Sequence, residues 1–117
     1  MKTIEVSELC KFAISEEKGL LLREKITDLL QDNNSEEVLL NFKGISMFTT
    51  PFFNSSIGYF ILKYGPEEFD KRIKLVGLEE MGQETYQHSR ENAIDFYNNK
   101  VNVKEVGEIV SKNLAED

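Results

Sequence analysis

Two adjacent hydroxyl residues, Thr49 and Thr50, stand directly before Pro51 near the middle of the chain. The sequence predicts that a helix opens at Pro51, because proline at the first helical position loses no hydrogen bond. Thr50 is then expected to be the N-cap, where its hydroxyl accepts a bond from a first-turn amide. Free amides and the positive end of the helix dipole would also stabilise a phosphate there. A capping role for Thr50, with Thr49 as a simple loop residue, is the alternative, and the two roles are compatible.

Other reactive groups in the sequence lack the neighbours that catalysis or metal binding needs. Cys10 is the single cysteine and His88 the single histidine, so no pair of these residues has metal-ligand spacing. We expect Cys10 to be a buried thiol that anchors a short turn together with Phe12, and His88 to be a surface residue. Ser55 and Ser56 have no recognisable base, and no glycine-rich phosphate loop is present. The sequence therefore predicts no catalytic residue, no metal site and no cofactor.

The elements around the threonine pair are predicted from the spacing of apolar residues. The apolar run 38–42 indicates a strand covered on both faces, as in a parallel sheet. A helix is expected over about 51–64, ended by Gly65 and Pro66. Its face toward the sheet has apolar residues at helical spacing, namely Phe53, Ile57, Phe60, Ile61 and Tyr64.

A neighbouring flank of the same helix carries Phe52, Ser56 and Tyr59. Two aromatic residues with a small residue between them could form a docking surface for a partner, because exposed aromatic residues favour interfaces. Burial of this flank under the C-terminal region is the alternative, since large apolar residues are normally buried.

The rest of the chain alternates between strand and helix. The expected elements are a strand at 1–6, a turn at 8–12, a helix at 16–31, a polar connection at 67–71, a strand at 72–78, a helix at 80–98 and a helix at about 102–114. A short strand at 101–103 is the alternative to the start of the last helix. Ser15 is expected to cap the helix at 16–31. This alternation predicts an α/β fold, a small, mainly parallel sheet of three or four strands with helices packed on it.

Gly19 falls inside the helix at 16–31, on the same face as Leu22 and Ile26. A glycine inside a helix costs about 1 kcal/mol relative to alanine. Its place on the packed face suggests that another backbone approaches closely, and simple tolerance is the alternative.

The segment from Met47 to Pro51, with the helix that follows, resembles the STAS-like domains, relatives of sulfate-transporter and anti-sigma-factor-antagonist modules. In that family an apolar strand precedes a loop of the form apolar, Asp, Ser, Ser/Thr, Gly, and then a helix. Thr49 and Thr50 occupy the hydroxyl positions here, while Phe48 replaces the acidic residue and Pro51 the glycine. The pattern covers roughly 1–98, and we expect 1–117 to form a single STAS-like domain with a C-terminal helix at about 102–114.

The resemblance implies a non-catalytic regulatory domain that binds another protein. The implied partner is a histidine-kinase-like ATPase or an anti-sigma-type kinase, and the implied switch is phosphorylation of Thr50 or Thr49. The implied partner surface contains Phe48, Pro51 and the start of the helix. Two alternatives remain: a small-ligand-binding or enzymatic domain with a cleft at the C-terminal ends of the strands, and a constitutive scaffold without a switch.

Composition narrows the class of protein further. The formal net charge of −7 argues against a nucleic-acid surface, which needs clustered positive charge. Residues 1–6 do not resemble a signal peptide, and no apolar run is long enough to cross a bilayer. We therefore expect a cytoplasmic protein that binds no membrane. The oligomeric state is not predicted.

Overall fold

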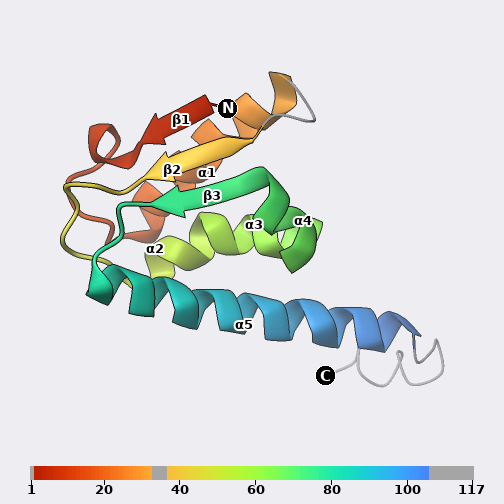
Figure 1. The fold of residues 1–117 in the computed structure, drawn as a ribbon. Coiled ribbons are helices and arrows are strands. Elements are labelled where there is room, and N and C mark those ends of the chain that lie inside the picture. The colour runs from red at the N-terminus through yellow and green to blue at the C-terminus, as the bar shows by residue number, and fades with distance from the viewer. Residues whose placement is uncertain (1, 33–36, 106–117) are drawn as a thin grey trace.

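The computed structural model describes residues 2–32 and 37–105, with five α-helices and three strands among them (Figure 1). In chain order the elements are β1 (Lys2–Glu5), a short 3-10 turn (Val6–Glu8), α1 (Glu16–Asp32), β2 (Val38–Asn41), α2 (Thr50–Ser55), α3 (Ile57–Tyr64), α4 (Pro66–Arg72), β3 (Ile73–Val76) and α5 (Glu80–Glu105). The predicted α/β class and the small parallel sheet are confirmed.

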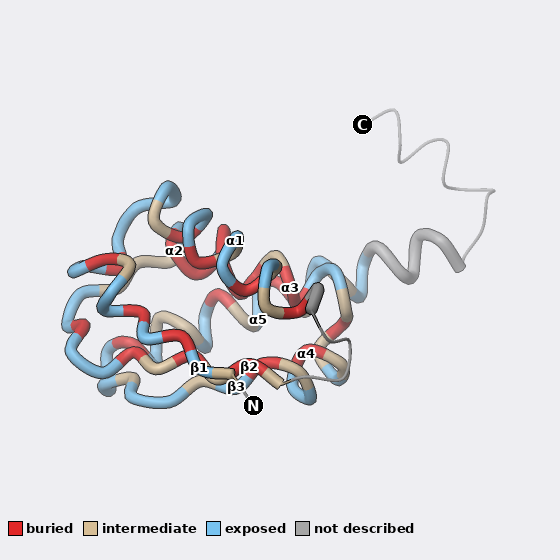
Figure 2. The backbone as a smooth tube through the Cα atoms, turned by 90° about the horizontal axis from the view of Figure 1, so that it is seen from above, coloured by how far each residue is buried: buried red, intermediate tan, exposed pale blue. Residues whose placement is uncertain are grey.

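The three strands lie side by side in the order β1, β2, β3, and both pairs are parallel. β1 and β2 are therefore each followed by a helical crossover that leads to the next strand: α1 links β1 to β2, and α2, α3 and α4 link β2 to β3. Figure 2 views the sheet close to edge-on and shows α1, α2 and α3 on one side of it. Consecutive right-handed crossovers place their helices on the same side.

The prediction that β2 is covered on both faces is wrong, because the helices cover one face only. Val38 and Leu40 of β2 are buried under the helices, together with Ile4 of β1. On the opposite face Thr3 and Lys74 are exposed at the positions paired with Leu39. The apolar run was consistent with two covered faces, but the strand order places both crossovers on the same face.

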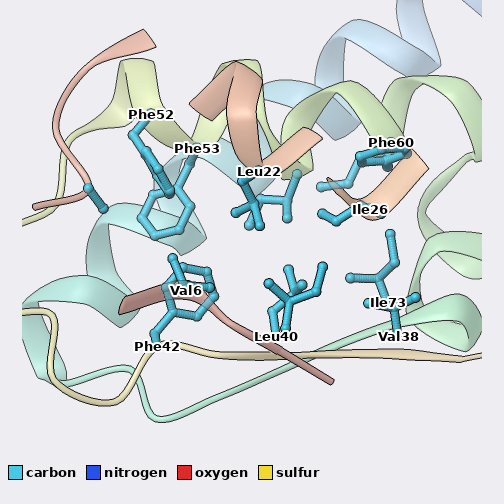
Figure 3. Close-up of a cluster of buried hydrophobic side chains, with 14 of the residues drawn as sticks. Val6, Leu22, Ile26, Val38, Leu40, Phe42, Phe52, Phe53, Phe60 and Ile73 are labelled. Atoms are coloured by element: carbon cyan, nitrogen blue, oxygen red, sulfur yellow. The ribbon is translucent and has the colours of Figure 1, made fainter. Parts of the chain in front are cut away.

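The hydrophobic core fills the space between the sheet and the helical layer. Figure 3 shows Leu22 and Ile26 of α1 and Phe53 of α2 pointing toward Leu40 and its strand neighbours. Five phenylalanines are almost completely buried, and they are Phe42, Phe52, Phe53, Phe60 and Phe69. Burial of side chains of this size is the main stabilising contribution in a small domain.

The helix predicted at 51–64 is divided into α2 and α3 by Ser56. The backbone of Ser56 leaves helical geometry, with φ −99° and ψ −92°. Its buried hydroxyl donates to the carbonyl oxygen of Phe52 at 2.8 Å. Serine side chains that bond to a carbonyl one turn back bend helices. The predicted inward residues Phe53, Ile57 and Phe60 are nevertheless all buried, as expected.

The polar connection predicted at 67–71 is wrong, since these residues belong to α4. Gly65 has a positive φ of 85° and ends α3, as predicted, and Pro66 then opens the next helix. Phe69 of α4 is buried and packs into the hydrophobic core. At the exposed side Arg90 of α5 pairs with Asp70 through two contacts of 2.8 Å each. This ion pair and a bond to Tyr86 raise the pKa of Arg90, although partial burial opposes the rise.

α5 is longer than predicted and continues without a break to Glu105. The expected helix start at Asn102 and the alternative strand at 101–103 are therefore both wrong. The remainder of the predicted C-terminal helix, 106–114, lies outside the described residues. Contacts with α2 and α3 hold α5 against the helical layer, and its C-terminal end extends past α4 (Figure 1).

Two predictions about α1 are confirmed. The Ser15 side chain accepts a hydrogen bond from the Lys18 amide at 3.1 Å, as expected of an N-cap. Gly19 lies where α1 meets α2, and a Cβ atom there would stand 1.9 Å from Ser55 Oγ and 2.5 Å from the Phe52 carbonyl oxygen. Glycine therefore permits the close approach of the two helices.

Candidate functional site

Thr49, rather than Thr50, is the N-cap of α2, so the predicted cap is wrong by one residue. The Thr49 hydroxyl accepts a hydrogen bond from the Phe52 amide at 3.4 Å and donates one to the carbonyl oxygen of Ile14. Its own amide donates to the Ala13 carbonyl oxygen at 3.0 Å. Thr49 thus joins the start of α2 to the segment that precedes α1.

Thr50 occupies the first position of α2, and its side chain is partly exposed. Among the described residues, none forms a hydrogen bond with the Thr50 hydroxyl. The amides of Phe52 and Phe53 are already bonded to Thr49, and Pro51 has no amide hydrogen. The first turn therefore offers less to a phosphate than the sequence suggested, but the Thr50 hydroxyl, unlike that of Thr49, is not held by a hydrogen bond to another described residue.

An apolar patch lies beside this threonine pair. Phe12, Ile14 and Met47 are 48%, 37% and 50% exposed and form what we call the apolar patch. A single parallel bridge pairs Ala13 with Phe48, and the Ala13 amide donates to the Met47 carbonyl oxygen at 3.0 Å. Because side chains alternate along extended backbone, inward packing of Ala13 turns Phe12 and Ile14 outward.

The sequence did not identify the apolar patch, and the expectation that Phe12 anchors a turn is wrong. Cys10 is buried as predicted, and desolvation raises the pKa of its thiol, which keeps it neutral and unreactive. The alternation of Phe12, Ala13 and Ile14 was a signal of extended backbone, but only the bridge to Phe48 shows which side faces solvent.

Two of the residues expected on a partner surface lie in the interior. Phe52 and Ser56 are buried, so they contribute nothing to the surface of the folded chain. Tyr59 is partly buried, and the Arg23 guanidinium of α1 lies over its ring at 3.9 Å from the ring centre. The flank is therefore covered, as one alternative held, but by α1 rather than by the C-terminal region. Pro51 is exposed.

Phe48, the residue in place of the family's acidic position, packs inward. Its ring stacks on Phe53 with centres 5.7 Å apart, and it lies 6.1 Å from the ring of Phe42. A Cβ atom at Gly82 would stand 2.8 Å from the Phe48 ring, so Gly82 lets α5 approach the loop. Phe48 thus joins the loop to β2, α2 and α5 instead of facing a partner.

Three other features that could indicate function are a metal-ligating cluster, the single histidine and a membrane-spanning helix. Within 2–32 and 37–105 there is no group of three or more His, Cys, Asp or Glu side chains that could hold a metal ion. His88 is exposed, as predicted. In that same part of the chain, no helix has the length and apolar character needed to span a bilayer.

A shallow hollow of about 470 Å³ lies at the C-terminal end of β3, where the predicted alternative places a ligand cleft. Leu75, Val76 and Gly77 form one side, and Gln83, Tyr86 and Gln87 of α5 form the other. Its lining has two amides, one phenol and the carboxylate of Glu84 as polar groups. Glu84 and Tyr86 are the ionisable side chains among these lining residues.

The unequal bonding of the two threonines predicts unequal effects on stability. Thr49→Val keeps the shape of the side chain but removes the cap and the bond to Ile14, so we expect it to lower the free energy of unfolding by about 1–2 kcal/mol. Thr50→Val, the matched control, should change it by less than about 0.5 kcal/mol. Urea unfolding measures both, and equal losses would contradict the assigned cap.

Comparison with known proteins identifies the family. The sequence matches the STAS-like domain of unknown function (DUF4325) over residues 18–83, which is more than half of the 117 residues. The matched segment includes β2, the threonine pair and β3, whereas Phe12 and Ile14 precede it. No match is found among curated proteins or solved structures. The chain therefore belongs to the family of STAS-like domains of unknown function.

Proposed function

We propose that this chain is a non-catalytic regulatory domain that binds a partner protein through the apolar patch of Phe12, Ile14 and Met47. One observation carries the proposal: three large apolar side chains, each at least a third exposed, stand on two paired segments next to the partly exposed Thr50. Single exposed apolar residues are normal, but groups of them mark interaction sites.

Phosphorylation of Thr50 is the proposed switch. The Thr50 hydroxyl is partly exposed and takes part in no hydrogen bond with another described residue, so its modification removes no interaction from the fold. A phosphate would add close to two negative charges at the edge of an apolar interface, which opposes association by desolvation. Thr49 is the less suitable acceptor because its hydroxyl holds the cap and the bond to Ile14.

Membership of the STAS-like family supports the choice of partner class. We propose a cytoplasmic histidine-kinase-like ATPase or an anti-sigma-type kinase, the partner that the loop resemblance implies. The inward position of Phe48 leaves the loop without the family's acidic side chain, so recognition by such a partner would depend on the apolar patch and on Thr50.

The test is affinity capture from the native cytoplasm with four baits, read by quantitative mass spectrometry. Wild type and Thr50→Gln should capture the same kinase-like ATPase, because the glutamine variant is uncharged. Met47→Glu and Thr50→Glu should reduce its recovery by about tenfold, since each places a charge in the interface. Leu21→Glu is the control for the patch, because Leu21 of α1 is 41% exposed and is not one of the three residues of the patch.

The outcomes separate the parts of the proposal. If recovery of the ATPase falls with Met47→Glu but not with Thr50→Glu, the apolar patch is supported as the binding surface and phosphorylation of Thr50 is contradicted as the switch. Equal recovery by all baits, or loss with Leu21→Glu to the same extent, would reject the apolar patch as the interface.

The hollow at the C-terminal end of β3 supports a second candidate, a small-ligand-binding domain. A ligand that binds only the folded state raises the free energy of unfolding by RT ln(1 + [L]/Kd) and therefore raises the unfolding temperature. A thermal-shift screen with nucleotides and small carboxylic acids tests this function. A shift that Gln83→Ala and Gln87→Ala abolish would favour it over the protein-binding proposal.

A further inference from the structure

β3 is an edge strand, because it pairs with β2 on one side and with no described strand on the other. Figure 1 shows this free edge on the side of the sheet nearer to α5. An edge strand presents backbone amide and carbonyl groups to which a further strand can bond. β3 has 4 residues, and at about 3.3 Å per residue its edge is about 13 Å long.

The register of the β2–β3 pair shows which backbone groups of β3 point outward. The Phe42 amide donates to the carbonyl oxygen of Val76 at 2.9 Å, so Val76 directs its backbone groups toward β2. Successive residues of a strand turn these groups to opposite sides, and Leu75 therefore directs its amide and carbonyl away from β2. Within 2–32 and 37–105, no residue bonds to either backbone group of Leu75.

An open hollow, rather than a packed element, lies beside this edge. It is the hollow of about 470 Å³ that has residues 75–78 on one side and residues of α5 on the other. Leu75 and Tyr86 are partly buried and give the hollow apolar surface. Glu84 is exposed at its wall and forms no ion pair with another described residue. Lys74 directs its ammonium group to a backbone carbonyl of α4 at 2.5 Å, so the charge that lines the hollow is negative.

We propose that an extended segment of a partner protein, in which basic and apolar residues alternate, binds here as an added strand beside β3. Its backbone pairs with the free amide and carbonyl of Leu75, which is the way in which a peptide extends a sheet. Its side chains alternate between the two faces of the sheet. A basic side chain that faces the hollow lays its stem over Tyr86 and reaches Glu84 with its charge. An apolar side chain on the other face lies beside Val76, which is 44% exposed.

This docking site is separate from the proposed function, because β3 and α5 form it, whereas the apolar patch lies on the segments joined by the bridge of Ala13 and Phe48. It also differs from the small-ligand alternative for the same hollow, since a small ligand has no strand to pair with the backbone of Leu75. The response of the Leu75 amide therefore distinguishes the three cases.

Amide hydrogen exchange of the full chain, measured by NMR, tests the free edge without a ligand. Amides without a partner exchange faster than amides held in a ladder between strands. We expect the Leu75 amide to exchange at least about tenfold faster than the Val76 amide, which faces β2. Equally slow exchange of both amides would overturn the proposal, because the edge would already be paired.

Four capped hexapeptides serve as probes of the added strand, and they alternate lysine with valine, isoleucine, leucine or phenylalanine. At about 1 mM, at least one should slow the exchange of the Leu75 amide about threefold or more, because a paired amide is protected. Methylation of the peptide's backbone nitrogens at one set of alternate residues should abolish this effect. Methylation of the other set, whose amides face away from β3, should leave it unchanged.

Charge variants test the basic character of the segment. Glu84→Gln should weaken binding of the active peptide about fivefold, whereas Glu24→Gln, the same change at an exposed residue of α1, should not. Equal effects of the two variants would contradict the proposed role of Glu84. No response of Leu75 to any of the four peptides would overturn the added strand. So would a response that survives methylation of either set, or one confined to the amides of Phe12 and Met47.

Discussion

Gly19→Ala should lower the free energy of unfolding by about 3 kcal/mol, against the direction set by helix propensity. Propensity alone would favour alanine inside α1 by about 1 kcal/mol. The added methyl group, however, would stand 1.9 Å from Ser55 Oγ and 2.5 Å from the Phe52 carbonyl oxygen. The serine side chain can rotate away, but the backbone oxygen belongs to α2, so α1 and α2 must separate. Urea unfolding measures the loss.

Two further variants isolate the cause. Leu20→Ala, at the neighbouring exposed position of α1, should change stability by less than about 1 kcal/mol. Ser55→Ala combined with Gly19→Ala should recover only part of the loss, because the contact with the Phe52 oxygen remains. A Gly19→Ala protein as stable as wild type, or more stable, would show that α1 and α2 are not in close contact.

Phe53→Ala should be the most destabilising single truncation, lowering the free energy of unfolding by about 3–5 kcal/mol. Phe53 is fully buried, and its ring contacts four other aromatic rings. The ring centres of Phe42, Phe48, Phe52 and Tyr86 lie 5.4–6.0 Å from it. Its removal would leave a cavity between the sheet, the threonine loop and α5.

Phe96→Ala is the matched control, because the same atoms are removed from a ring that is 61% exposed. We expect its loss to be below about 1 kcal/mol, because a largely exposed side chain leaves no buried cavity when it is removed. Similar losses for the two variants would contradict the position of Phe53 at the centre of the core.

The parts of the fold that depend on local spacing could be predicted from the sequence. Three correct predictions each involve residues only a few positions apart in the sequence: the Ser15 cap, the apolar strand at 38–42 and the end of a helix at Gly65. α4 was missed although its signals were present: Pro66 at the first position, two acidic residues in the first turn and two basic residues in the last. The coverage of one sheet face depends on strand order, which no local pattern contains.

The candidate site was predicted less well because its parts are far apart in the sequence. The sequence indicated the right loop, but the cap belongs to Thr49 because its hydroxyl also meets Ile14, 35 positions earlier. Phe52 and Ser56 were expected at a surface, yet the close approach allowed by Gly19 buries their flank under α1. The apolar patch exists only because Ala13 pairs with Phe48.

The most direct test of the proposed function is photo-crosslinking in the native cytoplasm from a benzoylphenylalanine placed at Met47. The control carries the same group at Leu21 of α1, which has a similar exposure and is not part of the patch. We expect one discrete adduct from position 47, with a kinase-like ATPase, that is absent from position 21 and is lost when Thr50→Glu is added. Absence of an adduct at position 47, or the same adduct from both positions, would contradict the assignment of the apolar patch as a regulated protein-binding surface.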